Sequence, residues 1–248
     1  MNREFYSDRG DLEISGAGKS GGGKYNRVEV NGASKINGDI ECVEFEASGA
    51  AKFEGNVKTV SYNVSGATKC LGNVEADFCE IRGAGKIEGN LHSKDSKIEG
   101  SFKVGGNFIG EIIDIQGAAK IIGDCEAEDF ICSGAITIGG LLNSEKVSID
   151  IAGRSEIPEI GGKIINVKLA PFGIGFLSKI TKALFNTSVN ELNCNVIEGD
   201  EIYLEGTEAR IIRGNDVVIG KKCTIQRVEY KNSLSVDPSS KVLEQIKL

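Results

Sequence analysis

Few residues of this chain have the type and spacing that ligand binding or catalysis requires. The run Gly18-Lys19-Ser20 looks like the end of a phosphate-binding loop, but the glycine required five residues earlier is Glu13. A second match, Gly18 to Lys24, has the right glycine spacing, yet Tyr25 replaces the Ser or Thr that would hold magnesium. We therefore interpret both runs as parts of a repeat and predict no nucleotide cofactor.

The residues that carry acid–base, metal or thiol chemistry are equally sparse. The chain has one histidine, His92, and no nucleophile or set of metal ligands accompanies it at a recognisable spacing. Seven cysteines include no Cys-x-x-Cys pair, so we predict neither disulfides nor a zinc or redox site, and expect the cysteines to pack in the core. We expect a non-enzymatic protein without cofactor or metal.

Composition narrows the classes of partner. The chain has 248 residues, 36 of them acidic and 29 basic, and a net charge of −7. This balance argues against binding to a phosphate backbone, and we expect no nucleic acid partner. No stretch approaches the ~20 apolar residues needed to cross a bilayer, and the first residues lack a signal-peptide core. We therefore expect a cytoplasmic protein.

The elements that must position any site come from a short repeat of constant length. Two columns of glycine, each advancing by the interval from Gly32 to Gly49, run from about Val30 to Val147. Such a short fixed period predicts a chain that stacks on itself as a solenoid. Because glycine accepts positive φ without steric cost, we place these residues at corners of the coil. The corner glycines are Gly32, Gly38, Gly49, Gly55, Gly66, Gly72, Gly83, Gly89, Gly117 and Gly123.

The rest of each repeat predicts short strands. Apolar columns begin at Val30, Ile36, Ile40 and Phe45, and their spacing of mostly two or four residues is that of one face of a strand. A uniformly small column that begins at Ala33 indicates close approach of backbone. The unit is too short to hold a strand, a helix and a second strand. We predict an all-β fold, a parallel single-stranded β-solenoid whose coils have three sides. Asn or Asp after the second glycine can form a hydrogen-bonded ladder along the stack.

The glycine register breaks after Gly140, and this break divides the chain. Gly153 arrives two residues late, and strand-like segments with the six-residue glycine spacing return near Gly214 and Gly220. We predict an N-terminal tail over 1–11, a regular solenoid over 12–160, a linker over 161–190, a second short β-coil segment over 191–237 and a C-terminal tail over 238–248.

The linker contains a short basic amphipathic sequence, predicted as a helix over about 172–185. Three roles are open for it: to cap an end of the solenoid, to lie on an anionic membrane surface, or to occupy the groove of a partner protein. The residues that would carry these roles are Phe172, Ile174, Phe176, Leu177, Lys179, Ile180, Lys182, Leu184 and Phe185.

A column of lysine is predicted to form a stripe along the solenoid. Like charges at the ~4.8 Å strand spacing repel each other, but Glu54 and Glu88 lie two residues away on the same face. We interpret the stripe as a solvated, mutually screened face, and keep contact with an anionic surface or lateral packing as the alternative. The stripe consists of Lys35, Lys52, Lys69, Lys86, Lys103 and Lys120.

The repeat unit resembles that of the bactofilins, bacterial polymer-forming cytoskeletal proteins. Its pattern apolar-x-Gly-Ala-x-Lys-apolar-x-Gly-Asn/Asp-apolar is seen over Val64 to Val74 and Ile81 to Leu91. The later runs from Val196 and Arg213 are similar to the C-terminal half of the longer Firmicute members. The resemblance implies a right-handed parallel β-helix, no nucleotide cofactor, self-assembly through the terminal coils and association with the inner face of the membrane.

These observations together favour a cytoskeletal or scaffold protein that associates with itself. Its expected partners are copies of itself, the anionic inner membrane surface and cell-envelope proteins. The alternative is a soluble solenoid that never polymerises and offers one face to a protein partner.

Overall fold

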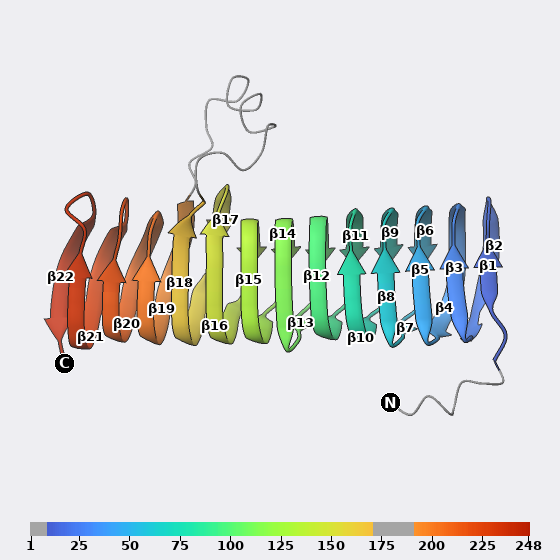
Figure 1. The fold of residues 1–248 in the computed structure, drawn as a ribbon, viewed down its shortest axis with the longest axis horizontal. Helices are drawn as coiled ribbons and strands as arrows, with labels where there is room; N and C mark the ends of the chain where they lie inside the picture. The colour runs from blue at the N-terminus through green and yellow to red at the C-terminus, as the bar shows by residue number, and fades with distance from the viewer. Residues whose placement is uncertain (1–8, 171–190) are drawn as a thin grey trace, which may run out of the picture. The chain divides into compact units, whose positions relative to one another are not determined.

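The computed structural model describes residues 9–170 and 191–248, and the chain forms two compact units, Met1–Gly123 and Asp124–Leu248. All described secondary structure is β-strand, and successive coils pair through parallel strands (Figure 1). The strands of unit 1 are β1 (Leu12–Ile14), β2 (Gly18–Lys24), β3 (Arg27–Val30), β4 (Ala33–Glu41), β5 (Glu44–Ala47), β6 (Ala50–Phe53), β7 (Val57–Lys58), β8 (Ser61–Val64), β9 (Ala67–Cys70), β10 (Val74–Ile81), β11 (Ala84–Ile87), β12 (Leu91–Val104), β13 (Phe108–Ile109) and β14 (Ile112–Ile121). Those of unit 2 are β15 (Cys125–Ile138), β16 (Leu141–Ile151), β17 (Arg154–Glu156), β18 (Glu159–Leu169), β19 (Glu191–Leu204), β20 (Thr207–Ile219), β21 (Thr224–Val236) and β22 (Lys241–Lys247).

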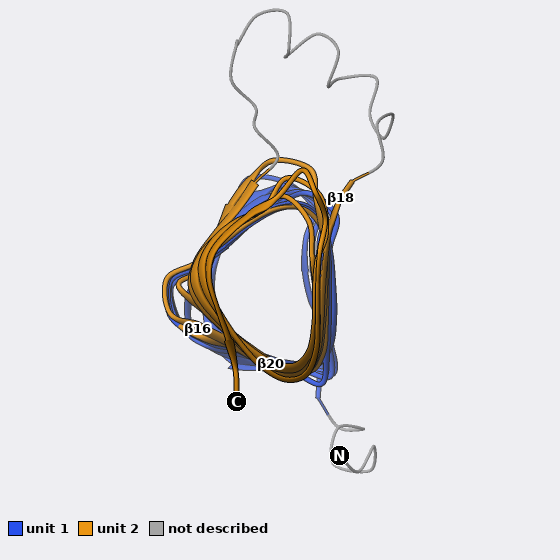
Figure 2. Ribbon diagram, turned by 90° about the vertical axis from the view of Figure 1, so that its left-hand side faces the viewer, with its two compact units in different colours: residues 1–123 blue, residues 124–248 orange. Residues whose placement is uncertain are grey.

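Each coil of unit 1 has three sides. In one coil these are β8, β9 and the start of β10, which we call the first, second and third side. Seen along the stack, the ribbon of each unit follows a rounded three-sided outline (Figure 2). Tyr62 pairs with Phe45 in the preceding coil and with Cys79 in the next, and this interval is one coil. The parallel β-solenoid, with ~17 residues per turn, is therefore confirmed.

The core of unit 1 consists of inward-facing columns that stack from coil to coil. Phe45 is fully buried, and its ring stacks on Tyr62 at 4.8 Å and meets Phe53 edge to face at 4.9 Å. The four apolar columns predicted from the sequence face inward. A further buried column on the second side escaped the sequence analysis because it mixes small and polar residues with one aromatic: Ser34, Ala51, Thr68, Gly85, Phe102 and Ala119.

Close approach of successive coils selects most of the corner glycines. A Cβ atom at Gly49 would lie 2.2 Å from the carbonyl oxygen of Gly32, and one at Gly66 would lie 2.1 Å from that of Gly49. The explanation by positive φ is right only at Gly38 (φ 99°) and Gly117 (φ 138°) among the ten predicted corner residues. For the other eight it is wrong, because each has ordinary φ and would bring a Cβ within 3.0 Å of another atom: Gly32, Gly49, Gly55, Gly66, Gly72, Gly83, Gly89 and Gly123.

A ladder of Asp and Asn side chains follows the corner between the second and third sides. The backbone N–H of Asn56 donates to Asp39 Oδ1 at 2.7 Å, and the backbone N–H of Asn73 donates to Asn56 Oδ1 at 2.9 Å. The next two rungs, from Asn90 to Asn73 and from Asn107 to Asn90, are 2.8 Å each. Each side-chain oxygen thus satisfies a backbone donor of the following coil at a place where the strand ladder is interrupted.

Unit 2 keeps the same construction with less regular coils. The pairing of Val147 with Ile165 makes one coil a residue longer than those of unit 1, and that of Ile197 with Ile212 makes another two residues shorter. Ile165 pairs with Ile202, so residues 171–190 interrupt a coil whose remaining part again has the length found in unit 1.

The structure differs from the sequence prediction at two segments of unit 2. β18 occupies the first part of the predicted linker, and β22 lies in the predicted C-terminal tail. The predicted helix over 172–185, with all of its residues, lies outside the described residues.

These differences have a common physical origin. The broken glycine register predicted the end of the regular solenoid, but a ladder of parallel strands tolerates coils of unequal length when the extra residues lie at the corners. β18 pairs with β16 on one side and with β19 on the other, so the two predicted β-segments share one ladder within unit 2.

Candidate functional site

The predicted lysines lie in one outward-facing column on the second side of unit 1. Alternation along the strand places them there: in β6, Ala51 and Phe53 are buried while Ala50 and Lys52 face outward. The register of β2 and β4 adds one residue that the sequence analysis missed, because Lys19 pairs with Lys35. The first coil is one residue shorter, which hid this lysine from the regular spacing. We call the resulting column the lysine face: Lys19, Lys35, Lys52, Lys69, Lys86, Lys103 and Lys120.

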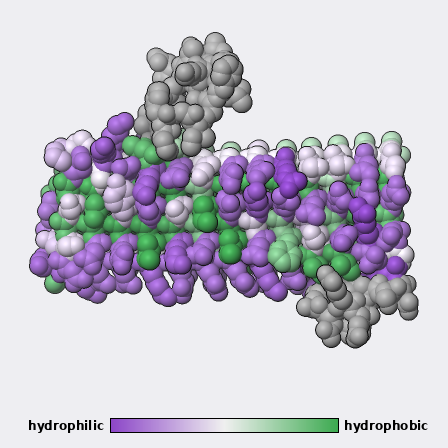
Figure 3. Space-filling model, in the orientation of Figure 1, coloured by the Kyte–Doolittle hydropathy of each residue, from purple (hydrophilic) through white to green (hydrophobic). Residues whose placement is uncertain are grey.

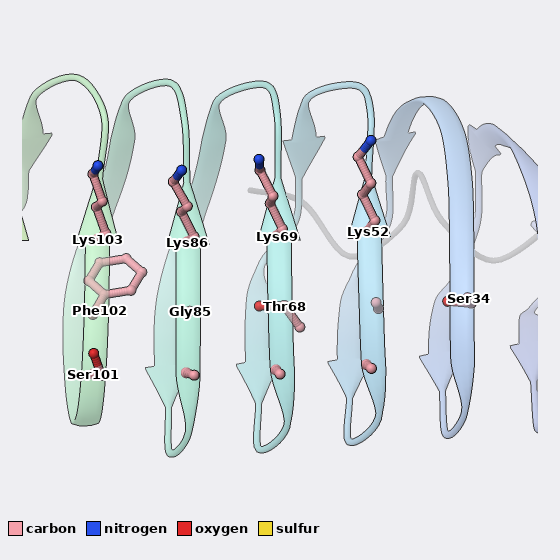
Figure 4. A pocket seen from close by; sticks show the side chains of 13 residues that line it. Ser34, Lys52, Thr68, Lys69, Gly85, Lys86, Ser101, Phe102 and Lys103 are labelled. Carbon is pink, nitrogen blue, oxygen red and sulfur yellow. The ribbon is translucent and has the colours of Figure 1, made fainter.

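A second column, of small residues, runs beside the lysine face on the same side of unit 1. The small side chains of this column were interpreted as a sign of close backbone approach, but in the structure these side chains are exposed to solvent. Between the two columns lies a shallow furrow of about 460 Å³, over the strand backbone at Ala51, Thr68 and Gly85. Figure 4 shows Lys52, Lys69, Lys86 and Lys103 at the same level of successive strands, directed to the same side. The small column is Ala33, Ala50, Ala67, Ala84, Ser101 and Ala118.

Two glutamates neutralise part of the lysine face. Glu54 accepts from Lys35 Nζ at 2.8 Å and from Lys52 Nζ at 3.2 Å. Glu88 accepts from Lys69 Nζ at 2.8 Å and from Lys86 Nζ at 2.7 Å. The hydrogen bond from Lys69, then that from Lys86, lowers the pKa of Glu88 to about 2, and Lys35 and Lys52 lower the pKa of Glu54 in the same way.

The glutamates alternate with residues that carry no charge. Leu71, Gly105 and Ile122 lie at the positions of their coils that Glu54 and Glu88 occupy in theirs. Among residues 9–170 and 191–248, no ion pair is found for Lys103 or Lys120. We call the space between two successive lysines of the lysine face a gap. Some gaps hold a carboxylate that contacts both lysines, and others hold none.

The remaining surface of unit 1 is less uniform, and hydrophilic and hydrophobic residues lie side by side on the face drawn in Figure 3. Most charges there are paired, as in Lys58 with Glu75 at 2.6 Å and Lys97 with Glu99 at 2.7 Å. Exposed apolar residues on this surface include Phe78 (55% exposed), Ile112 (44% exposed) and Ile109 (39% exposed).

In the outermost coils, the last residues of the core columns are apolar and only half-buried. In unit 1, Leu12 and Ile14 of β1 cover Val28 and Val30. In the described part of the chain, β1 pairs only with β3 and β22 only with β21. At the end of unit 2, three half-buried residues cover the fully buried Val217, Ile219 and Ile225: they are Leu234, Val236 and Val242.

The cysteines and the histidine form no reactive cluster in the described structure. All seven cysteines are buried and none forms a disulfide, and desolvation raises the pKa of Cys79 to about 12 and of Cys42 and Cys70 to about 11. His92 is exposed and lies between Glu75 and Ile109 in its column. Within the described residues, no group of three or more His, Cys, Asp or Glu is arranged to hold a metal ion.

The predicted membrane-binding residues over 172–185 lie outside the described part of the chain. Within the described part, no helix has the length and apolar character required to cross a membrane.

Two proteins of Bacillus subtilis (strain 168) are similar to part of this chain. The uncharacterized protein YhbF is 37% identical over 109 residues, which is 44% of this chain and 42% of YhbF. The uncharacterized protein YhbE is 38% identical over 109 residues, which is 44% of this chain and 43% of YhbE. The chain thus spans about two fifths of the length of these relatives. No family model matches it, and no solved structure matches it.

Proposed function

We propose that the chain is a non-enzymatic scaffold protein of bactofilin type that associates with copies of itself through its outermost coils. One observation carries the proposal: the core columns end in half-buried apolar residues beside strand edges that have no partner in the described chain. A solenoid is stabilised by contacts between neighbouring coils, so a coil with a neighbour on one side only lacks half of its stabilising interactions.

A second copy supplies the missing interactions at the C-terminal coil. Leu234, Val236 and Val242 each have one face in contact with the coil below, and Leu243 is 64% exposed on β22. Burying such side chains fully contributes ~1.5–3 kcal/mol each relative to the exposed state, and about half of that remains to be gained here. Among the described strands β22 pairs only with β21, so its other edge can offer backbone donors and acceptors of Lys241–Lys247 to a parallel or antiparallel strand.

The N-terminal coil offers a shorter surface of the same kind. Leu12 and Ile14 end two core columns, while β2 has the sequence Gly-Lys-Ser-Gly-Gly-Gly-Lys and presents little apolar surface. Glycine-rich strands specify their register weakly. We therefore assign the stronger self-associating surface to the C-terminal coil.

The remaining parts of the proposal concern location and partners. We propose that the protein acts in the cytoplasm on the inner face of the membrane, where residues 172–185 dock on anionic lipid and where cell-envelope proteins join it. The basic amphipathic sequence supports this, through Lys179 and Lys182. Flotation with phosphatidylglycerol vesicles tests it: Lys179→Glu with Lys182→Glu abolishes flotation, and unchanged flotation contradicts it.

Sedimentation velocity over a concentration series tests self-association. The full wild-type chain is expected to form larger species as its concentration rises. Leu234→Glu combined with Val242→Glu is expected to abolish them, because each substitution places a carboxylate where the next copy would pack. The control is Ile131→Glu, at a position 41% exposed on the surface of unit 2. A single species at every concentration, or association that the paired substitution leaves unchanged, overturns the proposal.

A second candidate function is a platform that binds a protein partner without polymerising. The furrow beside the lysine face favours it, because such a surface has a definite shape and charge.

A further inference from the structure

Two carboxylates of the chain show how the lysine face can bind an anion. Glu54 lies between Lys35 and Lys52, one coil apart, and contacts both ammonium groups at 2.8 and 3.2 Å. Glu88 repeats this arrangement two coils further along unit 1. A gap between successive lysines thus accepts one carboxylate with two charge-assisted hydrogen bonds.

Between Lys35 and Lys120, three other gaps are also flanked by two lysines and hold no carboxylate. They lie between Lys52 and Lys69, where the corner residue is Leu71, between Lys86 and Lys103, and between Lys103 and Lys120. The first two are two coils apart, which is ~9.6 Å at the usual strand spacing. Ile122 stands at the corner of the third and is 44% exposed.

Charge favours an anionic occupant along this line. The lysine face itself has seven lysines, and two glutamates contact it, although the chain as a whole has a net charge of −7. The lysines are partly exposed, for example Lys69 at 43% and Lys86 at 36%, so their ammonium groups are within reach of a ligand. Successive lysines also repel one another, and an added carboxylate relieves that repulsion.

The furrow determines the shape of the occupant. It runs across five successive strands, with exposed Ala50, Ala67 and Ala84 on one side and lysines on the other. Its floor is strand backbone, and small side chains leave room for one extended chain. In polyproline II conformation three residues advance ~9.3 Å, close to the ~9.6 Å between the first two gaps, so an acidic residue at every third position meets alternate gaps.

We propose that the lysine face is a docking site for an acidic, extended polypeptide segment of a partner protein, whose carboxylates fill the gaps that Glu54 and Glu88 leave open. The open gaps between Lys52 and Lys120 lie on the second side of unit 1, outside its first coil, and the proposal does not depend on self-association.

The most direct test introduces glutamates of the chain itself into two open gaps and leaves every lysine in place. Leu71→Glu places a carboxylate between Lys52 and Lys69, and Ile122→Glu places one between Lys103 and Lys120. Glu54 and Glu88 show that the coil accepts glutamate at this position. The matched control adds the same charge on the other sides of unit 1 by Ile109→Glu with Ile112→Glu, at positions 39% and 44% exposed.

The probe is a fluorescein-labelled twelve-residue peptide with glutamate at every third position, measured by fluorescence anisotropy against the full chain. Leu71→Glu with Ile122→Glu is expected to weaken binding about two- to thirtyfold, as for the loss of the two exposed ion pairs at the gap beside Leu71, and the control variant to change it less than twofold. The affinity is expected to fall as salt rises. Circular dichroism checks that all variants remain folded.

Three results overturn the proposal: equal binding by the gap-filled and control variants, equal binding of a peptide with glutamine in place of glutamate, or no peptide binding at all. If phosphatidylglycerol vesicles bind through the same lysines in place of the peptide, the lysine face belongs to a membrane. A failure here leaves self-association untouched, because the sedimentation variants alter only the C-terminal coil.

Discussion

The account of the corner glycines makes a strong prediction at Gly66. Its substitution by alanine places a Cβ atom 2.1 Å from the carbonyl oxygen of Gly49 and 2.6 Å from that of Ser48. Ordinary van der Waals contact begins at 3.4 Å, so the two coils must separate locally by roughly 1.3 Å. Both contacts are with backbone, which cannot move aside as a flexible side chain does.

The structure gives the magnitude of the effect. Separation on that scale breaks two backbone hydrogen bonds between the coils, from Ser65 to Ala47 at 2.9 Å and from Ala67 to Gly49 at 3.1 Å. Each contributes about 0.5–1.5 kcal/mol, and overpacking typically costs about 1–3 kcal/mol more. Gly66→Ala is therefore expected to lower the free energy of unfolding by roughly 2–6 kcal/mol.

Urea denaturation followed by circular dichroism measures this change, and Gly21→Ala is the matched control. A Cβ at Gly21 meets no atom within 4 Å, and its φ lies outside the left-handed region. The control is expected to leave stability unchanged or raise it by about 0.4–1 kcal/mol, through the unfolded state. Equal midpoints for the two variants would refute the argument from close approach.

Three further predictions concern the core, the lysine face and the cysteines. Phe45→Ala removes a fully buried ring and is expected to cost about 3–5 kcal/mol in urea denaturation, while Phe78→Ala, at 55% exposure, is expected to stay within about 0.5 kcal/mol of the wild type. Because the pKa of Glu88 falls from 4.5 to about 2 on folding, its contribution to stability is present above about pH 4.5 and is lost as the pH falls toward 2; the difference in midpoint between wild type and Glu88→Gln should shrink over that window, and a constant difference would count against the ion pairs. Ellman's reagent at pH 8 is expected to label no thiol in the native protein and all seven in denaturant, since all seven are buried and burial raises the pKa of Cys70 and Cys79; rapid native labelling would show the cysteines to be accessible.

Much of the fold could be predicted from the sequence because each coil repeats the same local rules. The glycine period and the alternation of apolar residues determine the coil length and the inward columns. The lysines and the two glutamates near them could be placed on one face for the same reason. The Asp and Asn ladder also follows from its column, although the structure shows backbone amides, rather than neighbouring side chains, as the donors for most rungs.

What could not be predicted depends on interactions between coils rather than within one. The approach of backbone to backbone at Gly49 and Gly66 has no sequence signal that separates it from positive φ. Lys19 was missed because its coil is one residue short, and only the strand register reveals its place. The continuation of the ladder through β18 was hidden for a related reason, since residues 171–190 separate strands that pair directly.

Electron microscopy of the purified chain tests the central claim of self-association most directly. At high concentration the wild type is expected to form linear assemblies in negative stain, and the variant with Leu234→Glu and Val242→Glu is expected to remain as single particles. Single wild-type particles at every concentration, or assemblies of equal length in the variant, would contradict the claim.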